Sequence, residues 1–240
     1  MSDKIKGTNE GSKVETLIEN YLNSKIIKDL ENSSLKKFIL YICEDNKIEI
    51  KKDTTIKVKK FEKEDLKIKG SPKTDRVFFI NNKEFRISIK SGYGGAFHQE
   101  PEVTFINFLK DNTDINKEII IFLKSFLRSD KIEIRNSIVA KFFKKNRSIL
   151  INRVFTGRFK EPEVDYYYFC PRVEKIDSME TKIKKIKKGK YINKSLLLKY
   201  VASQDSNGAC PVGRLTFQAY GRKRGTDIQF KWGTCYNDIK

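Results

Sequence analysis

Apolar residues recur every three or four positions in several segments of the chain, and this spacing places them on one face of a helix. In the first such segment, residues 12–23, the apolar stripe runs from Val14 to Leu22, and Glu15 lies at its border. The same spacing predicts helices in five further segments, the last of which is rich in lysine: residues 33–45, 101–111, 116–130, 136–146 and 179–203.

Short runs of β-branched and aromatic residues predict strands elsewhere. Residues 76–80 and 84–90 are two such runs, and "NNK" between them is typical of a tight β-hairpin turn. Strand character returns in residues 147–159 and 164–173, and an alternating hairpin with a Gly/Arg/Lys turn follows in residues 206–233. Helices and strands mix along the chain, which predicts an α/β fold.

The balance of charges indicates the kind of partner. Lys and Arg number 50 against 31 Asp and Glu, which gives a formal net charge of +19. Such an excess favours a polyanion, and nucleic acid is the commonest one. A lysine-rich coding bias is the alternative, because it raises the lysine count without any function. The 240 residues, 38% of them hydrophobic, suffice to bury a core as one large domain or two small ones.

The cysteines argue against a zinc site. Cys43, Cys170, Cys210 and Cys235 lie far apart, no two form a CxxC pair, and the chain has one histidine. We therefore expect free, buried thiols in a reducing cytoplasm. The sequence has no run of eighteen apolar residues and no apolar leader, so we expect a cytoplasmic protein that neither enters nor crosses a membrane.

The most informative chemistry lies in residues 71–102. Asp75 stands where the first hairpin strand begins, and Ser88 and Lys90 lie two positions apart in the second strand, so their side chains share one face. Hydrolysis of a phosphodiester needs an oriented water and charge neutralisation at the phosphate, which carboxylate-bound Mg²⁺ and a nearby lysine supply. The alternative is a surface hairpin with ordinary charges. We expect Asp75 and Lys90 to be catalytic, with Mg²⁺ as the cofactor.

This stretch, "SPKTD" followed by "SIK", resembles the core of the PD-(D/E)xK nucleases. The pattern expects an acid where Ser88 stands, and the resemblance implies two ways to complete the metal site. In one, Asp75 binds the metal together with a strand carbonyl, that of Ile89. In the other, the second carboxylate lies on the following helix, which we expect to begin at "HQEPE". That helix offers Glu100 first and Glu102 second, and Glu100 is the favoured ligand.

The resemblance extends in order along the chain to the small type II restriction endonucleases that cut GCGC and CCGG. The segments that carry it are "GSKVETLIENYL", "GSPKTD", "KKNRSILINRVFTGRF" and "GRLTFQAYGRKRGTDIQFK". It implies a restriction-endonuclease-like core, a central mixed β-sheet flanked by helices, with a C-terminal β-rich DNA-recognition part. We expect a catalytic domain in residues 1–155 and the recognition region in residues 156–240. The resemblance also places Glu15 beside the site.

The last hairpin and the glycine-rich loop are the expected DNA contacts. Arginine and glutamine read base edges, whereas lysine suits phosphates, so the hairpin is either a base-reading element or only an exposed basic turn. By the resemblance, Gln99 approaches the duplex. His98 is the sole histidine, and since this nuclease chemistry does not require one, we expect it to make a DNA or a packing contact. The expected DNA-binding residues are Tyr93, His98, Gln99, Gln218, Arg222, Lys223, Arg224, Gln229 and Lys231.

The function that unites these observations is site-specific hydrolysis of double-stranded DNA at a short sequence, with Mg²⁺ and no small-molecule cofactor, as in restriction–modification. We expect a monomer or weak dimer. Two alternatives remain: a non-catalytic basic nucleic-acid-binding protein, which leaves Asp75 and Lys90 without a role, and a repair or junction-resolving nuclease with the same core.

Overall fold

The computed structural model describes residues 10–61, 73–92, 96–128, 137–157, 163–173, 178–208, 210–218 and 227–239. The chain forms two compact units that interleave along the sequence. Unit 1 comprises Met1–Tyr93, Glu161–Lys194 and Cys235–Lys240, and unit 2 comprises Gly94–Lys160 and Ser195–Thr234. The single boundary expected after residue 155 therefore does not describe the units, although one of the four crossings, between residues 160 and 161, falls near it.

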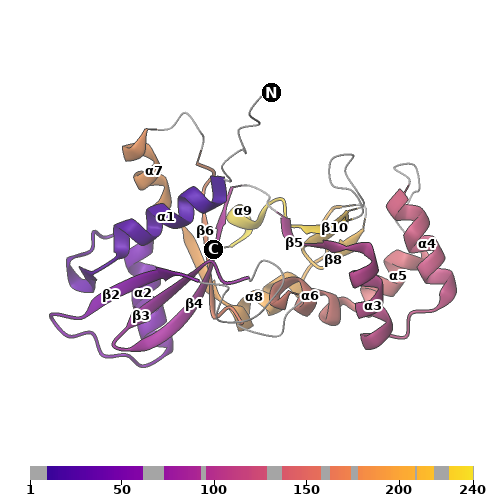
Figure 1. The fold of residues 1–240 in the computed structure, drawn as a ribbon, viewed down its shortest axis with the longest axis horizontal. Coiled ribbons are helices and arrows are strands. Elements are labelled where there is room, and N and C mark those ends of the chain that lie inside the picture. The colour runs from indigo at the N-terminus through magenta and orange to yellow at the C-terminus, as the bar shows by residue number, and fades with distance from the viewer. Residues whose placement is uncertain are drawn as a thin grey trace, which may run out of the picture. The chain divides into compact units, whose positions relative to one another are not determined.

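Unit 1 is built on a six-stranded mixed sheet in the order β1-β2-β3-β4-β6-β7. Only β4 and β6 run parallel, and the other neighbours are antiparallel. The strands are β1 (Lys25–Ile26), β2 (Thr55–Lys60), β3 (Arg76–Ile80), β4 (Lys83–Ser91), β6 (Tyr166–Cys170) and β7 (Lys190–Asn193). In the ribbon of Figure 1, β2, β3 and β4 spread apart from a common end.

A tight turn fixes the register of the β3–β4 hairpin. Ile80 pairs directly with Lys83, so Asn81 and Asn82 alone connect the strands. Both asparagines have positive φ, 48° and 63°, which a two-residue hairpin turn requires and asparagine tolerates. The predicted hairpin is confirmed, and its register places Asp75 and Ser88 at the same end of the sheet.

Two amphipathic helices cover the apolar face of this sheet. Helix α1 (Glu10–Leu22) buries Val14, Ile18 and Leu22, as its stripe predicts. Helix α2 (Ser34–Asp45) begins at the Ser33 cap and buries a similar stripe. Both pack into one core with the inward residues of β2, β3, β4 and β6, and Phe38 stacks on Tyr168 with ring centroids 5.2 Å apart. A 3₁₀ turn, η1 (Ile27–Asp29), follows β1, and α7 (Met179–Ile186) and α9 (Cys235–Asp238) complete the unit.

Unit 2 combines a four-stranded antiparallel sheet with helices. The sheet order is β5-β10-β9-β8, where β5 is Ala96–Pro101, β10 Asp227–Lys231, β9 Leu215–Gln218 and β8 Pro211–Val212. The helices are α3 (Glu102–Asn112), α4 (Lys117–Arg128), α5 (Ile138–Lys145), α6 (Arg147–Thr156) and α8 (Lys194–Ala202), whose first residue belongs to unit 1. An aromatic cluster forms the core, in which Phe217 lies 4.9 Å from Phe143 and 5.2 Å from Phe230 between ring centroids.

Three predicted elements differ from the structure. Residues 147–159 were expected to be a strand, but α6 is a helix that buries Leu150, Ile151, Val154 and Phe155, an i, i+1, i+4, i+5 spacing. The segment "HQEPE" was expected to open a helix, but its first four residues belong to β5, and α3 begins at its last residue, Glu102. From there on, the helix predicted over residues 101–111 is confirmed.

The lysine-rich helix expected over residues 179–203 is interrupted near Gly189. A Cβ at this position would lie 2.0 Å from the Tyr168 ring, so only glycine fits, and the strand β7 follows it.

The four cysteines are free and buried, as expected. Within the described parts of the chain, no helix combines the length and the apolar character that crossing a membrane requires.

Candidate active site

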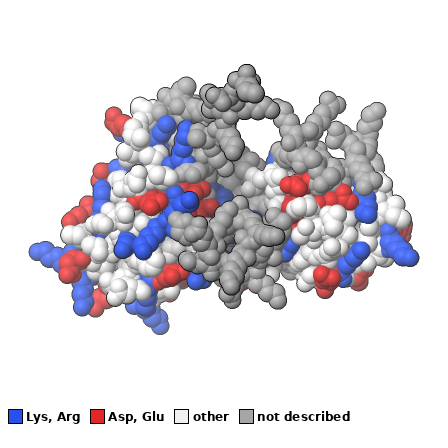
Figure 2. Space-filling model, viewed as in Figure 1, with Lys and Arg blue, Asp and Glu red and all other residues white. Residues whose placement is uncertain are grey.

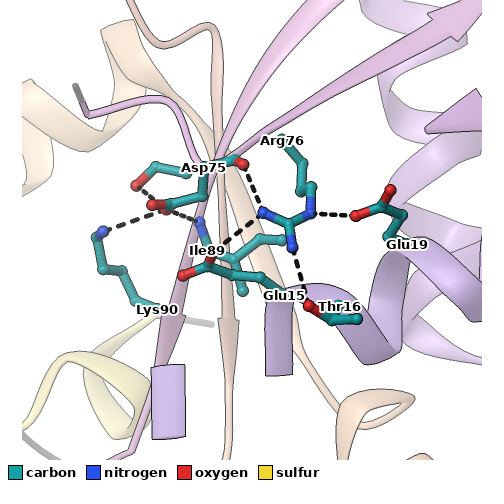
Figure 3. A network of polar contacts seen from close by, with 8 residues as sticks. Glu15, Thr16, Glu19, Asp75, Arg76, Ile89 and Lys90 are labelled. Carbon is teal, nitrogen blue, oxygen red and sulfur yellow. Dashed lines mark hydrogen bonds and ion pairs between the residues drawn. The ribbon is translucent and has the colours of Figure 1, made fainter. Parts of the chain in front are cut away.

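Asp75 occupies the end of the hairpin, immediately before β3. Its backbone N–H donates to the Ile87 carbonyl over 2.9 Å. Its carboxylate oxygen Oδ2 accepts from three consecutive residues of β4: Ser88 Oγ at 3.0 Å, the Ile89 N–H at 2.7 Å and Lys90 Nζ at 3.4 Å (Figure 3). One carboxylate oxygen thus receives a hydroxyl, an amide and an ammonium group, which fixes the orientation of the Asp75 side chain.

The structure brings Ser88 and Lys90 together on one face of β4, since both side chains reach the same oxygen. Ser88 is fully buried and acts as a hydrogen-bond donor that orients Asp75. The Lys90 side chain keeps 25% of its surface exposed, so its ammonium group is accessible from solvent. The backbone amide of Ile89 donates to Asp75. The role expected for Ile89 was that its carbonyl binds the metal, and this role stays a prediction.

Glu15 reaches the same end of the sheet from α1. Its Oε2 lies 3.1 Å from Nη1 of Arg76, the first residue of β3. Burial raises the pKa of Glu15, and the negative charge of Asp75 raises it further, while Arg76 and Lys90 act in the opposite direction. Geometry agrees with this, since Nη1 of Arg76 contacts both Glu15 and the main-chain carbonyl of Asp75.

The oxygen atoms at this site suit a hard divalent cation. In the described part of the chain, the hydrogen bonds to the Asp75 carboxylate all fall on Oδ2, which leaves Oδ1 for a ligand. The buried hydroxyl of Thr74 has no hydrogen-bond partner among the described residues and can accept one from a bound water. No group of three acidic, histidine or cysteine side chains forms there in the described residues, and Mg²⁺ is commonly held by one or two carboxylates, waters and substrate phosphates.

Glu100 lies in unit 2 and is fully buried in β5. Its Oε1 is 2.7 Å from His98 Nε2, and its Oε2 is 2.8 Å from Arg153 Nη2. Burial alone would raise the pKa of Glu100, but the hydrogen bonds from His98 and Arg153 outweigh it and hold the pKa below its usual value. Both carboxylate oxygens are engaged inside the unit, so a metal-ligand role for Glu100 stays a prediction that would require this pairing to open.

His98 is buried beside Glu100, on the same face of β5. Its ring lies 6.4 Å from that of Phe230 between centroids. This placement agrees with the packing alternative for His98, and a contact of His98 with DNA stays a prediction.

Three glutamines lie side by side across the sheet of unit 2. Gln99 pairs directly with Gln229 of the neighbouring strand, and Gln229 pairs with Gln218 of the next, so all three share one face. Gln99 is exposed, Gln218 is half-buried and Gln229 is buried. Gln99 Nε2 donates to Asp227 Oδ2 over 2.9 Å. Lys231, two residues beyond Gln229, belongs to the same strand.

The remaining expected DNA contacts lie outside the described residues. These are Tyr93, Arg222, Lys223 and Arg224. Among described residues, the charges on the face drawn in Figure 2 alternate in sign, with Lys and Arg interspersed among Asp and Glu.

Sequence reasoning missed Arg76, which is 3% exposed and contacts both Glu15 and the Asp75 backbone. A signal was present, because "RVFFI" places a lone charge in an otherwise apolar buried strand. A buried guanidinium needs partners, so that position predicts an acidic cluster nearby.

No family model and no curated protein sequence matches the chain. Its fold, however, is that of a restriction endonuclease. One similar solved structure is the crystal structure of the restriction endonuclease MspI in complex with its cognate DNA, with a TM-score of 0.61 and 15% sequence identity over 92% of this chain and 88% of that chain. The predicted fold class is confirmed.

Proposed function

We propose that the protein is a Mg²⁺-dependent endonuclease that hydrolyses double-stranded DNA at a short recognition sequence. The observation that carries this proposal is the convergence of Ser88, Ile89 and Lys90 on one oxygen of Asp75, with Glu15 close by, in a restriction-endonuclease-like fold. A purely structural hairpin has no need of a partly exposed lysine and two neighbouring carboxylates at its open end.

Asp75 and Glu15 would hold the cation. When bound, Mg²⁺ would orient a water and neutralise charge on the phosphate. Ser88 and the Ile89 amide fix the carboxylate of Asp75, so that its other oxygen has a defined direction. Lys90 supplies a positive charge beside Asp75, where it can hydrogen-bond the attacking water or stabilise the negative charge that develops on the phosphate.

Recognition would use the glutamine-bearing face of the sheet in unit 2. Gln99 and Gln218 present amides, which can pair with adenine through two hydrogen bonds, and Lys231 offers a charge for a phosphate. The net charge of +19 favours binding to DNA of any sequence, because binding releases counterions from the phosphates. The salt dependence of the affinity therefore measures this sequence-independent contribution separately.

Incubation of the protein with phage DNA and Mg²⁺ tests the proposal. Discrete fragments are expected with the wild type, and intact DNA with Asp75→Ala or in the presence of EDTA. A smear would indicate a nuclease without sequence specificity, such as a repair enzyme. Intact DNA that migrates more slowly in a native gel would identify a non-catalytic binding protein and contradict the proposal.

A further inference from the structure

Arg76 forms a buried polar cluster at the junction of β3 and α1. Its Nη1 lies 3.1 Å from Glu15 Oε2 and 2.8 Å from the main-chain carbonyl of Asp75. Its Nη2 donates to Thr16 Oγ1 over 3.2 Å, and its Nε lies 2.8 Å from Glu19 Oε2, an ion pair without hydrogen-bond geometry. Figure 3 shows the guanidinium lying between the strand end and the helix.

The position of Arg76 in the sheet makes this cluster unusual. Arg76 lies on the face that α1 and α2 cover, where the next inward residues of the same strand, Phe78 and Ile80, are apolar and buried. An apolar residue would satisfy the packing there, whereas a buried guanidinium is costly unless its hydrogen bonds are satisfied. The cluster therefore needs an explanation other than packing.

The guanidinium makes directional contacts between α1 and the sheet, which apolar packing does not provide. Burial of Val14 and Ile18 holds the helix against the sheet but is not directional. The planar guanidinium fork, in contrast, fixes both the distance and the orientation of the oxygens that it binds. Its contacts with Glu15, Thr16 and Glu19 span just over one turn of α1.

We propose that Arg76 is the positioning residue of the candidate active site, because one of its nitrogens, Nη1, binds both Glu15 and the Asp75 backbone and so sets the separation of the two carboxylates that would share a cation. This inference rests on the proposed function. Arg76 contacts Glu15 through Oε2, which leaves Oε1 of Glu15 for a metal, and Glu19 supplies a second negative charge beside Nε of Arg76.

Metal affinity of the folded protein tests this role without relying on activity. Mn²⁺ is the probe, and the electron paramagnetic resonance signal of free Mn²⁺ gives the bound fraction. Arg76→Lys keeps the charge but loses the fork, and we expect it to weaken Mn²⁺ binding by about tenfold, the lower end of the effect of losing a residue that orients a metal ligand. Arg86→Lys is the matched control, since Arg86 lies on β4 in an exposed pair with Glu84, and it should leave Mn²⁺ affinity unchanged.

Coupling to Glu15 separates positioning from general stability. If Arg76 acts through Glu15, the double variant Arg76→Lys/Glu15→Gln binds Mn²⁺ no more weakly than Glu15→Gln alone. Additive losses would overturn the proposal, and so would a lower melting temperature with unchanged Mn²⁺ affinity. If Arg76→Lys does not fold, Glu19→Gln replaces it. That change leaves Arg76 balanced by Glu15 alone, and unchanged Mn²⁺ affinity would again refute the inference.

Failure of the proposed function would look different. If Asp75→Ala binds Mn²⁺ as the wild type does, the metal site itself is misassigned. If Mn²⁺ binding depends on Asp75 but not on Arg76, only the positioning role of Arg76 is wrong.

Discussion

Replacement of Glu100 by glutamine distinguishes a structural carboxylate from a metal ligand. The side chain is fully buried, and its two oxygens pair with His98 and Arg153. Glutamine has nearly the same shape but no charge, so Arg153, whose side chain is 11% exposed, would lose its counter-ion in a largely desolvated place. Removal of one partner of such a buried pair costs about 3–5 kcal/mol.

The assay is chemical denaturation of the wild type and Glu100→Gln, followed by Mn²⁺ binding to the folded variant. We expect Glu100→Gln to lose about 3–5 kcal/mol of unfolding free energy and to keep the Mn²⁺ affinity of the wild type. Glu118→Gln is the control, because Glu118 is an exposed glutamate in the first turn of α4 in the same unit, and it should change stability by less than about 0.5 kcal/mol. Normal stability together with lost Mn²⁺ binding would refute the structural role and restore Glu100 as a metal ligand.

The pH dependence adds an independent check. Because the pKa of Glu100 is lower in the folded protein than in the unfolded chain, the ionised pair stabilises the fold fully above the unfolded value of about 4.3. This contribution is lost as the pH falls through the folded pKa. The stability difference between the wild type and Glu100→Gln should therefore shrink below about pH 4 and stay constant near neutrality.

Three further predictions concern other parts of the chain. Asp75→Asn should abolish cleavage and preserve DNA binding in a gel-shift assay, whereas cleavage at the wild-type rate would remove Asp75 from the site. Gln218→Ala should weaken binding to cognate duplex by roughly 1–3 kcal/mol more than binding to random duplex, while Lys231→Ala should weaken both alike; equal losses for both variants would show that the glutamine face does not read bases. The thiols of Cys43, Cys170, Cys210 and Cys235 should react with a disulfide reagent only after unfolding, because burial raises their pKa to about 11, 12, 12 and 11, respectively; rapid modification of the native protein would contradict their burial.

The parts of the structure that follow from local sequence were predictable. The β3–β4 hairpin depends on Asn81 and Asn82, which suit the turn by their own conformational preferences. The period of two along β4 was enough to place Ser88 and Lys90 on one face, and the helical stripe was enough to place α1. In each case the signal and its consequence lie within about fifteen residues of each other.

The parts that depend on distant pairing were not predictable. Strand β5 forms because it pairs with β10, more than 120 residues later, and nothing local in "HQEPE" indicates that partner. The helix α6 contains β-branched residues that favour a strand locally, and burial of its apolar face in unit 2 decides against it. The interleaving of the two units also depends on distant pairing, because the chain returns to the first sheet when β6 pairs with β4.

The serine at position 88 follows from the charges that surround it. Ser88 is fully buried, and its hydroxyl lies 3.0 Å from the Asp75 carboxylate, so an acid at this position would point at Asp75 from the next strand. Without a cation between them, two such carboxylates raise each other's pKa. The hydroxyl of Ser88 instead donates to the Asp75 carboxylate, and Lys90 supplies a positive charge to the same oxygen. Glu15, held by Arg76 on the other side, then supplies the second negative charge from a helix. In the proposed nuclease, the second acidic ligand would thus come from α1 in place of β4, and the cation would depend on the position of that helix.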